Sequence, residues 1–157
     1  MPIRPEHRWL YPIDWPELSA LIRFRRAKGR CEHCDRPHGR DVRHLGDGRW
    51  YDPDREQWRD DRGRRVRGLP SPETMASMPA AQLALLDLEE PALPPLTRVV
   101  LASAHLNHDP GDNRPGNLAA LCQRCHLTHD RQEHRRQRWL TLFRRRALGD
   151  LFLGAYR

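Results

Sequence analysis

The chain has 157 residues, of which 38% are hydrophobic and 31% are charged, and its formal net charge is +7 with an isoelectric point near 10.0. This length fits a single domain over residues 1–157, with a small core that needs an additional stabilising cross-link. No stretch approaches the roughly 18 apolar residues that a membrane span requires, and Met1 to His7 lack a hydrophobic stretch of signal-peptide type, so we expect a cytoplasmic protein with reduced thiols.

The first predicted element is a helix over residues 14–28. Asp14 stands at the N-cap position, with Pro16 in the first turn and Glu17 at the position that completes a capping box. Gly29 ends the helix directly before the first cysteine pair. The predicted apolar face of this helix consists of Leu18, Leu21, Ile22 and Phe24.

Residues 40–96 form a predicted insert. Glycines divide the charged stretch 42–68 into short segments, which predicts short strands in a β-hairpin, with Trp50 and Trp58 on one face for packing rather than base stacking. The proline-rich stretch 70–95 predicts a loop that one short helix over 80–88 interrupts.

Residues 98–130 are expected to form the core of the domain. A strand over 98–104 ends at His105, and the prolines and glycines of 110–116 require a loop. A short strand near Asn117 then leads into the second cysteine pair and a helix. A basic C-terminal helix over 131–153 follows, and its first arginines are Arg131, Arg135, Arg136 and Arg138.

All four cysteines fall into two pairs, Cys31-Glu-His-Cys34 and Cys122-Gln-Arg-Cys125. A gap of two residues lets both thiolates of a knuckle face one tetrahedral ion, so the knuckles at 31–34 and 122–125 predict a Cys₄ zinc site. Disulfides or thiol redox chemistry are the alternatives. A closed Cys₄ site leaves no open coordination position, so this zinc would be structural, joining the N-terminal helix to the C-terminal half.

The stretch Arg98 to Asp130 resembles the signature of HNH endonucleases: a histidine that ends a strand, a loop, an asparagine, then a cysteine pair followed at once by histidine. The three signature positions fall on His105, Asn117 and His126. Cys31 and Cys34 supply the zinc half of the cysteine-bearing branch, and Tyr11-Pro-Ile-Asp-Trp-Pro-Glu17 is similar to small phage and prophage HNH proteins. The resemblance implies an α+β fold with a ββα-metal core, and a bacterial or phage-infected host cell.

The resemblance also implies a function, the metal-dependent hydrolysis of DNA phosphodiester bonds. His105 would be the general base, because a neutral imidazole titrates near physiological pH. His126 would bind one catalytic divalent ion, Mg²⁺ or Mn²⁺, and Asn117 would brace the loop and orient the base. His129 and Asp130 follow on the same helix face, and either is a candidate second ligand.

One position departs from the family pattern. The residue before the first histidine usually binds the metal through a carboxylate or imidazole, but here it is Ala104, which cannot. The nearby substitutes reach the metal only if the chain turns at Asn107, and they are His108, Asp109 and Asp112. An alternative assignment makes His105 the metal ligand and His108 the base.

Lys28 is the only lysine, so nearly all the positive charge is arginine, whose guanidinium group binds phosphate through two parallel hydrogen bonds. The arginine excess favours nucleic acid as the partner, and the resemblance implies that it is DNA, most simply a duplex bound by the arginines of the final helix. The simpler alternatives are a solvated helix face and a basic surface that serves solubility. Two site residues also have simpler alternatives to a catalytic role. Asn117 is then an ordinary turn residue, and His126 only packs beside the zinc knuckle.

Two further functions stay open: a non-catalytic zinc-stabilised DNA-binding module, which lost activity with the acidic residue at 104, and an RNA-directed nuclease. The remaining histidines predicted to contact only solvent are His7, His38, His44 and His134. The sequence predicts no oligomeric state.

Overall fold

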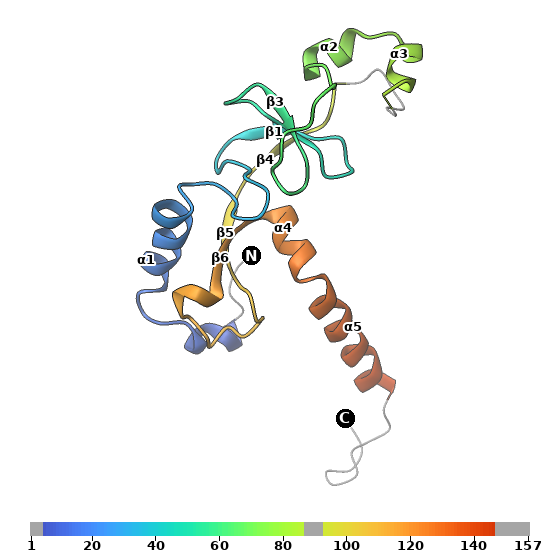
Figure 1. Ribbon diagram of the computed structural model, residues 1–157. Helices are drawn as coiled ribbons and strands as arrows, with labels where there is room; N and C mark the ends of the chain where they lie inside the picture. The colour runs from blue at the N-terminus through green and yellow to red at the C-terminus, as the bar shows by residue number, and fades with distance from the viewer. Residues whose placement is uncertain (1–4, 87–92, 147–157) are drawn as a thin grey trace.

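Three two-stranded antiparallel sheets and a series of short helices form an α+β fold in the computed structural model, which describes residues 5–86 and 93–146. The insert, with β1 to β4 and two small helices, lies at one end of the molecule (Figure 1). The N-terminal helices and the β5–β6 hairpin form the body, and the last helix extends away from it (Figure 1). Within the described ranges, no helix has the length and apolar character to cross a membrane.

The N-terminal segment is helical in three steps: the 3₁₀ helix η1 (Pro5–Leu10), α1 (Trp15–Ala20) and the π-helix η2 (Leu21–Arg26). It ends where Lys28 and Gly29 take positive φ angles of 52° and 70°, and the Gly29 amide donates to the Arg23 carbonyl at 2.9 Å. The left-handed backbone here favours glycine, which explains why the helix stops before the cysteines.

Two details of this helix differ from the prediction. The Asp14 side chain makes no cap hydrogen bond, because Pro16 has no amide to offer at the second position and the Asp14 backbone is not extended (φ −87°, ψ 20°). Leu21 and Phe24 are each 45% exposed, and only Ile22 is fully buried. The wider π turn after Ala20 shifts the register of the apolar face.

In the insert, β1 (Asp41–Arg43) pairs with β4 (Leu96–Arg98), and β2 (Trp50–Asp52) pairs with β3 (Gln57–Arg59). Trp58 lies opposite Tyr51, the neighbour of Trp50, so the two tryptophans face opposite sides of the hairpin. The prediction of a single tryptophan face is therefore wrong. Trp50 packs in the main core, whereas Trp58 packs with Met75 and Leu83 in a second cluster.

Two helices follow the hairpin where one was predicted. The sequence analysis missed α2 (Pro72–Ser77), which begins at Ser71, whose hydroxyl accepts the Thr74 amide at 3.2 Å. The second, α3 (Ala80–Ala84), is shorter than the predicted helix over 80–88, whose last two residues lie outside the described ranges.

The strand predicted over 98–104 is split between two sheets, β4 and β5 (Leu101–His105). The Gln123 side chain fills the gap: its Oε1 accepts the Val100 amide at 3.0 Å, and its Nε2 donates to the Arg98 carbonyl at 2.7 Å. Between them, the buried Val99 exchanges backbone hydrogen bonds with the segment before β1. The chain thus crosses from the insert to the body without losing its backbone partners.

In the body, β5 pairs with β6 (Leu118–Cys122), which is buried along its whole length. After β6 come α4 (Gln123–His129) and α5 (Arg131–Arg146), separated at Asp130. The predicted residues 147–153 of the last helix lie outside the described ranges. The main core gathers around the cysteines and includes Ile22, Val42, Trp50, Val99, Leu101 and Leu118.

A buried carboxylate, Asp52, stabilises the junction between the hairpin and the first cysteine loop. Its side chain is 0% exposed, and its Oδ2 lies 3.1 Å from Arg59, 3.2 Å from Arg55 and 3.4 Å from Arg30. We expect Asp52→Asn to lower the free energy of unfolding by about 2–4 kcal/mol, because it leaves partly buried cations without their counter-charge.

Urea unfolding of the variant measures this loss. The control is Asp54→Asn, because Asp54 is more exposed and pairs with arginines at the surface, and its loss should cost less than about 1 kcal/mol. Equal midpoints for the two variants would contradict the role of Asp52.

Candidate functional site

The four cysteines form one buried cluster. Their sulfur atoms lie within 4.8 Å of one another, and all four residues are buried. The first pair follows the helix end at Gly29 in a tight loop, closed by hydrogen bonds between Cys31 and the backbone of Asp35 and Arg36. The second pair spans the end of β6 and the start of α4. Four buried cysteines at this spacing can hold a structural metal such as zinc.

The surroundings of the cluster suit thiolates. The buried Arg36 donates from Nη1 to Cys34 Sγ at 3.2 Å, and the Cys122 amide donates to Cys31 Sγ at 3.3 Å. Four thiolates around Zn²⁺ carry a net charge of −2, which a buried guanidinium group and an amide dipole partly offset. The Sγ atoms of Cys34 and Cys122 are 3.5 Å apart, well beyond the roughly 2.05 Å of a disulfide.

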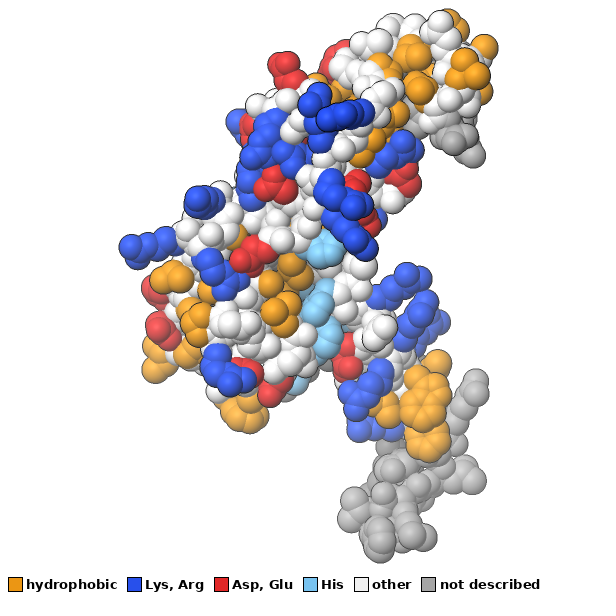
Figure 2. Space-filling view, viewed as in Figure 1, with side chains coloured by type: hydrophobic (Ala, Val, Ile, Leu, Met, Phe, Trp, Pro, Cys, Tyr) orange, Lys and Arg blue, Asp and Glu red, His pale blue; other side chains and the backbone are white. Residues whose placement is uncertain are grey.

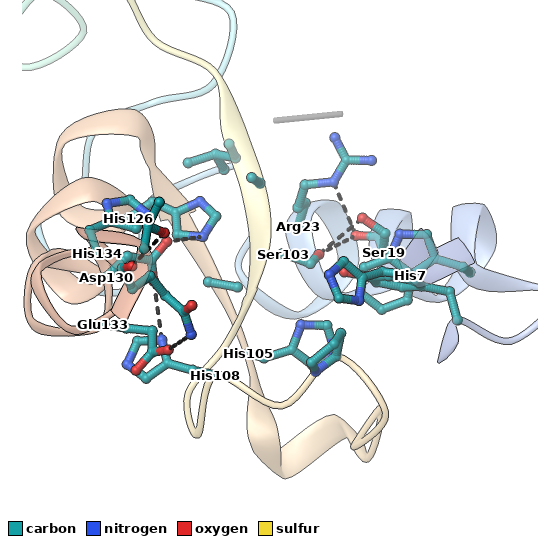
Figure 3. Close-up of a pocket in the computed structure, with 18 residues that line it drawn as sticks. His7, Ser19, Arg23, Ser103, His105, His108, His126, Asp130, Glu133 and His134 are labelled. Atoms are coloured by element: carbon teal, nitrogen blue, oxygen red, sulfur yellow. Dashed lines mark hydrogen bonds and ion pairs between the residues drawn. The ribbon is translucent and has the colours of Figure 1, made fainter. Parts of the chain in front are cut away.

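An open groove of about 720 Å³ runs beside β5, between the N-terminal helices and the α4–α5 segment. Figure 2 shows histidine side chains gathered on the concave side of the body that faces α5. One wall carries His7, Tyr11, Trp15 and Arg23, and the other carries His126, Asp130, Glu133, His134 and Gln137. Figure 3 shows His7 and Arg23 on one side of β5, and His126, Asp130, Glu133 and His134 on the other.

His105 ends β5 at the floor of the groove. Its ring stacks on Trp15, with centroids 5.5 Å apart and an interplanar angle of 10°, and meets Tyr11 edge-on at 5.7 Å. Its Nε2 lies 3.0 Å from the side-chain oxygen of Asn113. The imidazole of His105 is therefore held by contacts with its face and with one nitrogen.

Asn117 closes the loop between β5 and β6. Its Oδ1 accepts the Asn107 amide at 3.1 Å, and its Nδ2 donates to Asn107 Oδ1 and to the Asp112 carbonyl, both at 2.8 Å. The asparagine whose amide contacts the His105 imidazole is instead Asn113, which the sequence analysis did not single out. Asn113 lies in a loop of prolines, glycines and polar residues, where no spacing rule distinguishes it.

A second group of side chains lies on the α4 side of the groove, centred on Asp130. Asp130 Oδ2 is 3.2 Å from His126 Nε2, and its Oδ1 is 3.4 Å from His108 Nδ1. His129 stacks on His108 with centroids 4.5 Å apart, and the ligand atoms of His108, His129 and Asp130 lie within 4.8 Å of one another. Burial lowers the pKa of His126, partly against the effect of the Asp130 carboxylate, so its imidazole is neutral at physiological pH.

The chain does turn after Asn107. His108 has a φ of 61°, a left-handed conformation that is uncommon for residues other than glycine, and its side chain reaches Asp130. His129 Nε2 lies 3.3 Å from the His105 carbonyl. If His129 donates this proton, its Nδ1 keeps a lone pair for a cation, an arrangement common among metal-binding histidines.

The acidic substitutes proposed for position 104 have other partners. Asp109 Oδ1 accepts the Gly111 amide at 2.9 Å within its own turn. Asp112 pairs with Arg114 at 2.7 Å, and the hydrogen bonds from this guanidinium lower the pKa of Asp112 to about 2. Ala104 is 1% exposed and packs in the core opposite Ala119. Among the candidates, the carboxylate that lies with the histidines is therefore Asp130.

The arginines of α5 are divided between two faces. Arg131, Arg135 and Arg138 are exposed and spaced so that they share one face of the helix. Among the residues that the structure describes, these three form no ion pair, whereas Arg136 pairs with Glu133 at 3.4 Å. The first face of α5 thus presents three exposed guanidinium groups that can contact a polyanion.

Two of the histidines expected to contact only solvent have partners. His38 Nδ1 accepts the Leu101 amide at 3.0 Å, so its ring fixes the start of β5. His44 Nε2 lies 3.1 Å from the Thr97 hydroxyl in the insert. The prediction was wrong for these two because their contacts join residues far apart in the sequence. His7 and His134 line the open groove, where contact with solvent stays a prediction.

No family model, curated protein or solved structure matches this chain. The groove nevertheless has a definite chemistry. At the floor, the His105 imidazole is held by its face and one nitrogen, and on the α4 side His108 and His126 contact the Asp130 carboxylate, with His129 stacked on His108. A candidate proton acceptor and a group of candidate cation ligands in one groove can serve metal-assisted hydrolysis.

Proposed function

We propose that this protein is a metal-dependent endonuclease of the HNH type, which hydrolyses DNA phosphodiester bonds in the groove. The observation that carries the proposal is that His105, at the end of β5, lines the same groove as His108, His126 and Asp130 (Figure 3), and that His108 and Asp130 are grouped with His129. The chain order β5, loop, β6, α4 also supports the ββα-metal core that the sequence resemblance implies.

Phosphodiester hydrolysis needs two things that these groups can supply. A base must take a proton from the attacking water, and His105 has one ring nitrogen that Asn113 does not engage. A cation must neutralise the charge that develops on the phosphate and leaving oxygen. Bound between His105 and α4, it would hold the phosphate beside the water.

We propose Asp130 as the carboxylate ligand that replaces the one missing at Ala104. It lies between His126 and His108, so a cation there has imidazole ligands from both α4 and the turn after β5. Imidazole suits later transition metals better than Mg²⁺, so this ligand set favours Mn²⁺ of the two ions considered. The proposal leaves out two of the substitutes considered for position 104, Asp109 and Asp112, because each has another partner.

The same geometry favours His105 over His108 as the base. His108 contacts both His129 and Asp130, so it belongs to the candidate cation site. His105 instead contacts two aromatic rings and an amide, and within the described part of the chain it belongs to no group of candidate cation ligands.

A plasmid assay tests the activity. The purified protein is incubated with supercoiled DNA and Mn²⁺, Mg²⁺ or EDTA, with a single-stranded RNA of similar length in parallel. We expect nicked or linear DNA with Mn²⁺, less with Mg²⁺ and none with EDTA. Binding without cleavage under any metal would favour the non-catalytic DNA-binding module, and cleavage of RNA alone would favour the RNA-directed nuclease.

DNA binding by α5 makes a separate prediction. Replacing Arg131, Arg135 and Arg138 together with glutamine is expected to weaken duplex binding and to reduce the slope of log K against log salt by up to about 3, close to 0.9 for each phosphate that an arginine no longer neutralises. Fluorescence anisotropy at several salt concentrations, with EDTA to prevent cleavage, measures both quantities.

The charge-matched control replaces Arg62, Arg65 and Arg67, three exposed arginines of the insert. If the control loses affinity and the α5 variant does not, the DNA surface lies on the insert. If neither changes, the arginine faces are solvated and the DNA-binding proposal fails.

A further inference from the structure

We infer that Asn113 is a positioning residue that keeps the proton of neutral His105 on Nε2, so that Nδ1 is the nitrogen that accepts a proton. The side-chain oxygen of Asn113 lies 3.0 Å from His105 Nε2. An amide oxygen can only accept a hydrogen bond, so this contact requires a proton on Nε2. In a neutral imidazole the other nitrogen, Nδ1, then carries the lone pair.

The orientation of the Asn113 amide follows from its other partners. Its nitrogen donates to the carbonyls of Leu10 at 2.9 Å and Pro110 at 3.2 Å, with a longer contact to Gly111 at 3.4 Å. Rotating the amide by half a turn would place its oxygen against these carbonyls and its NH₂ group against His105. Carbonyl oxygens cannot donate, so the network holds the oxygen toward the imidazole.

The ring of His105 is held by its other contacts as well. Trp15 stacks on one face and Tyr11 meets the ring from the side. A half-turn of the ring about its Cβ–Cγ bond, which would exchange Nε2 with Cε1 and Nδ1 with Cδ2, would therefore have to disturb both aromatic contacts. The Leu10 carbonyl and these two rings all belong to the N-terminal segment. Leu10 lies 103 residues before Asn113 in the sequence. The segment 10–15 and the loop 106–117 together fix one tautomer.

The assignment of His105 as a base rests on the proposed function, but the tautomer is a property of the folded protein and can be measured without DNA. Two-bond ¹H–¹⁵N correlation spectra distinguish the two tautomers of each histidine, and loss of a signal set in His105→Ala identifies His105. In the wild type, above the pH at which His105 is protonated, we expect the Nε2–H form. An Nδ1–H form in the wild type would overturn the inference without any further variant.

Three variants separate positioning from folding. Asn113→Ala removes the acceptor, so we expect a mixture of tautomers. Asn113→Asp keeps an oxygen for Nε2–H but loses the donor to Leu10, so we expect the Nε2–H form to return. Asn107→Ala loosens the same loop at its contact with Asn117 and should leave the tautomer unchanged. A tautomer that shifts equally in Asn113→Asp and Asn107→Ala would show that only loop integrity matters.

Activity supplies the last readout. Removing a group that orients a reactive side chain typically costs a factor of about 10–100, so we expect that loss in kcat for Asn113→Ala, with KM and the Mn²⁺ half-saturation unchanged. Asn113→Asp should recover much of the rate. If the wild type cleaves nothing but the tautomers behave as described, the nuclease proposal fails and the positioning role stands. If the wild type cleaves and Asn113→Ala keeps both rate and tautomer, the positioning role fails.

Discussion

Removing the metal from the cysteine cluster is expected to abolish most of the cooperative unfolding transition of this protein. The four cysteines lie inside the main hydrophobic cluster, and the contact between Cys34 and Cys122 joins positions 88 residues apart. In zinc-finger peptides, structural zinc contributes about 10–16 kcal/mol, which exceeds the stability of a typical small domain. Without an ion, four thiols would share a buried space in which their sulfur atoms lie within 4.8 Å of one another.

The measurement combines metal analysis with thermal unfolding followed by circular dichroism. We expect about one zinc per chain and a large fall in melting temperature with a strong chelator. Cys34→Ser should show the same fall without chelator, and adding chelator to this variant should change little more. A purified protein that holds no metal and melts at the same temperature with and without chelator would disprove the structural zinc site.

The parts of the site that the sequence could predict are those set by local spacing. A two-residue gap between cysteines fixes where both thiolates point. On a helix, side chains three and four positions apart lie on the same face. Helical spacing alone therefore predicts that His126 and Asp130 lie together, and they are 3.2 Å apart. The sequence predicts that His108 can reach the metal site only if the chain turns at Asn107, and it does not predict the turn itself. That turn brings His108 to the same carboxylate.

The parts that could not be predicted depend on contacts between distant segments. Gln123 splits the strand expected over 98–104 because its amide replaces two ladder hydrogen bonds, and nothing in its sequence neighbourhood indicates that role. Asn113 is placed by the Leu10 carbonyl, more than a hundred residues away. The faces of Trp50 and Trp58 follow from the strand register, and a one-residue difference in register reverses every side chain.

The position of Ala104 changes how the departure from the HNH pattern is understood. In β5 this residue packs against β6 in the main core, so a carboxylate there would meet apolar neighbours. Asp130, at the break between α4 and α5, is instead beside the three imidazoles. In the proposed nuclease, the acidic ligand would therefore stand at the end of α4 and not in β5.

Replacing His105 with alanine is expected to lower the DNA cleavage rate by a factor of about 10² to 10⁴, the usual contribution of a general base, while leaving the affinity for Mn²⁺ nearly unchanged. Added Mn²⁺ should not restore the rate, because the missing group accepts a proton and holds no cation. Asp130→Asn should behave differently: it weakens Mn²⁺ binding, so cleavage should recover in part as the Mn²⁺ concentration rises. His126→Ala should follow Asp130→Asn, since the two side chains are in contact.

Initial rates of plasmid cleavage across a Mn²⁺ titration measure both effects, and calorimetric titration of Mn²⁺ into DNA-free protein measures binding separately. His44→Ala is the matched control, because His44 makes its contact with Thr97 in the insert and does not line the groove. It should cleave at the wild-type rate. If His105→Ala also does so, the base is His108 or another group. If His105→Ala weakens Mn²⁺ binding and recovers with excess metal, His105 is a ligand and the two histidines exchange roles, because only a ligand can be compensated by mass action.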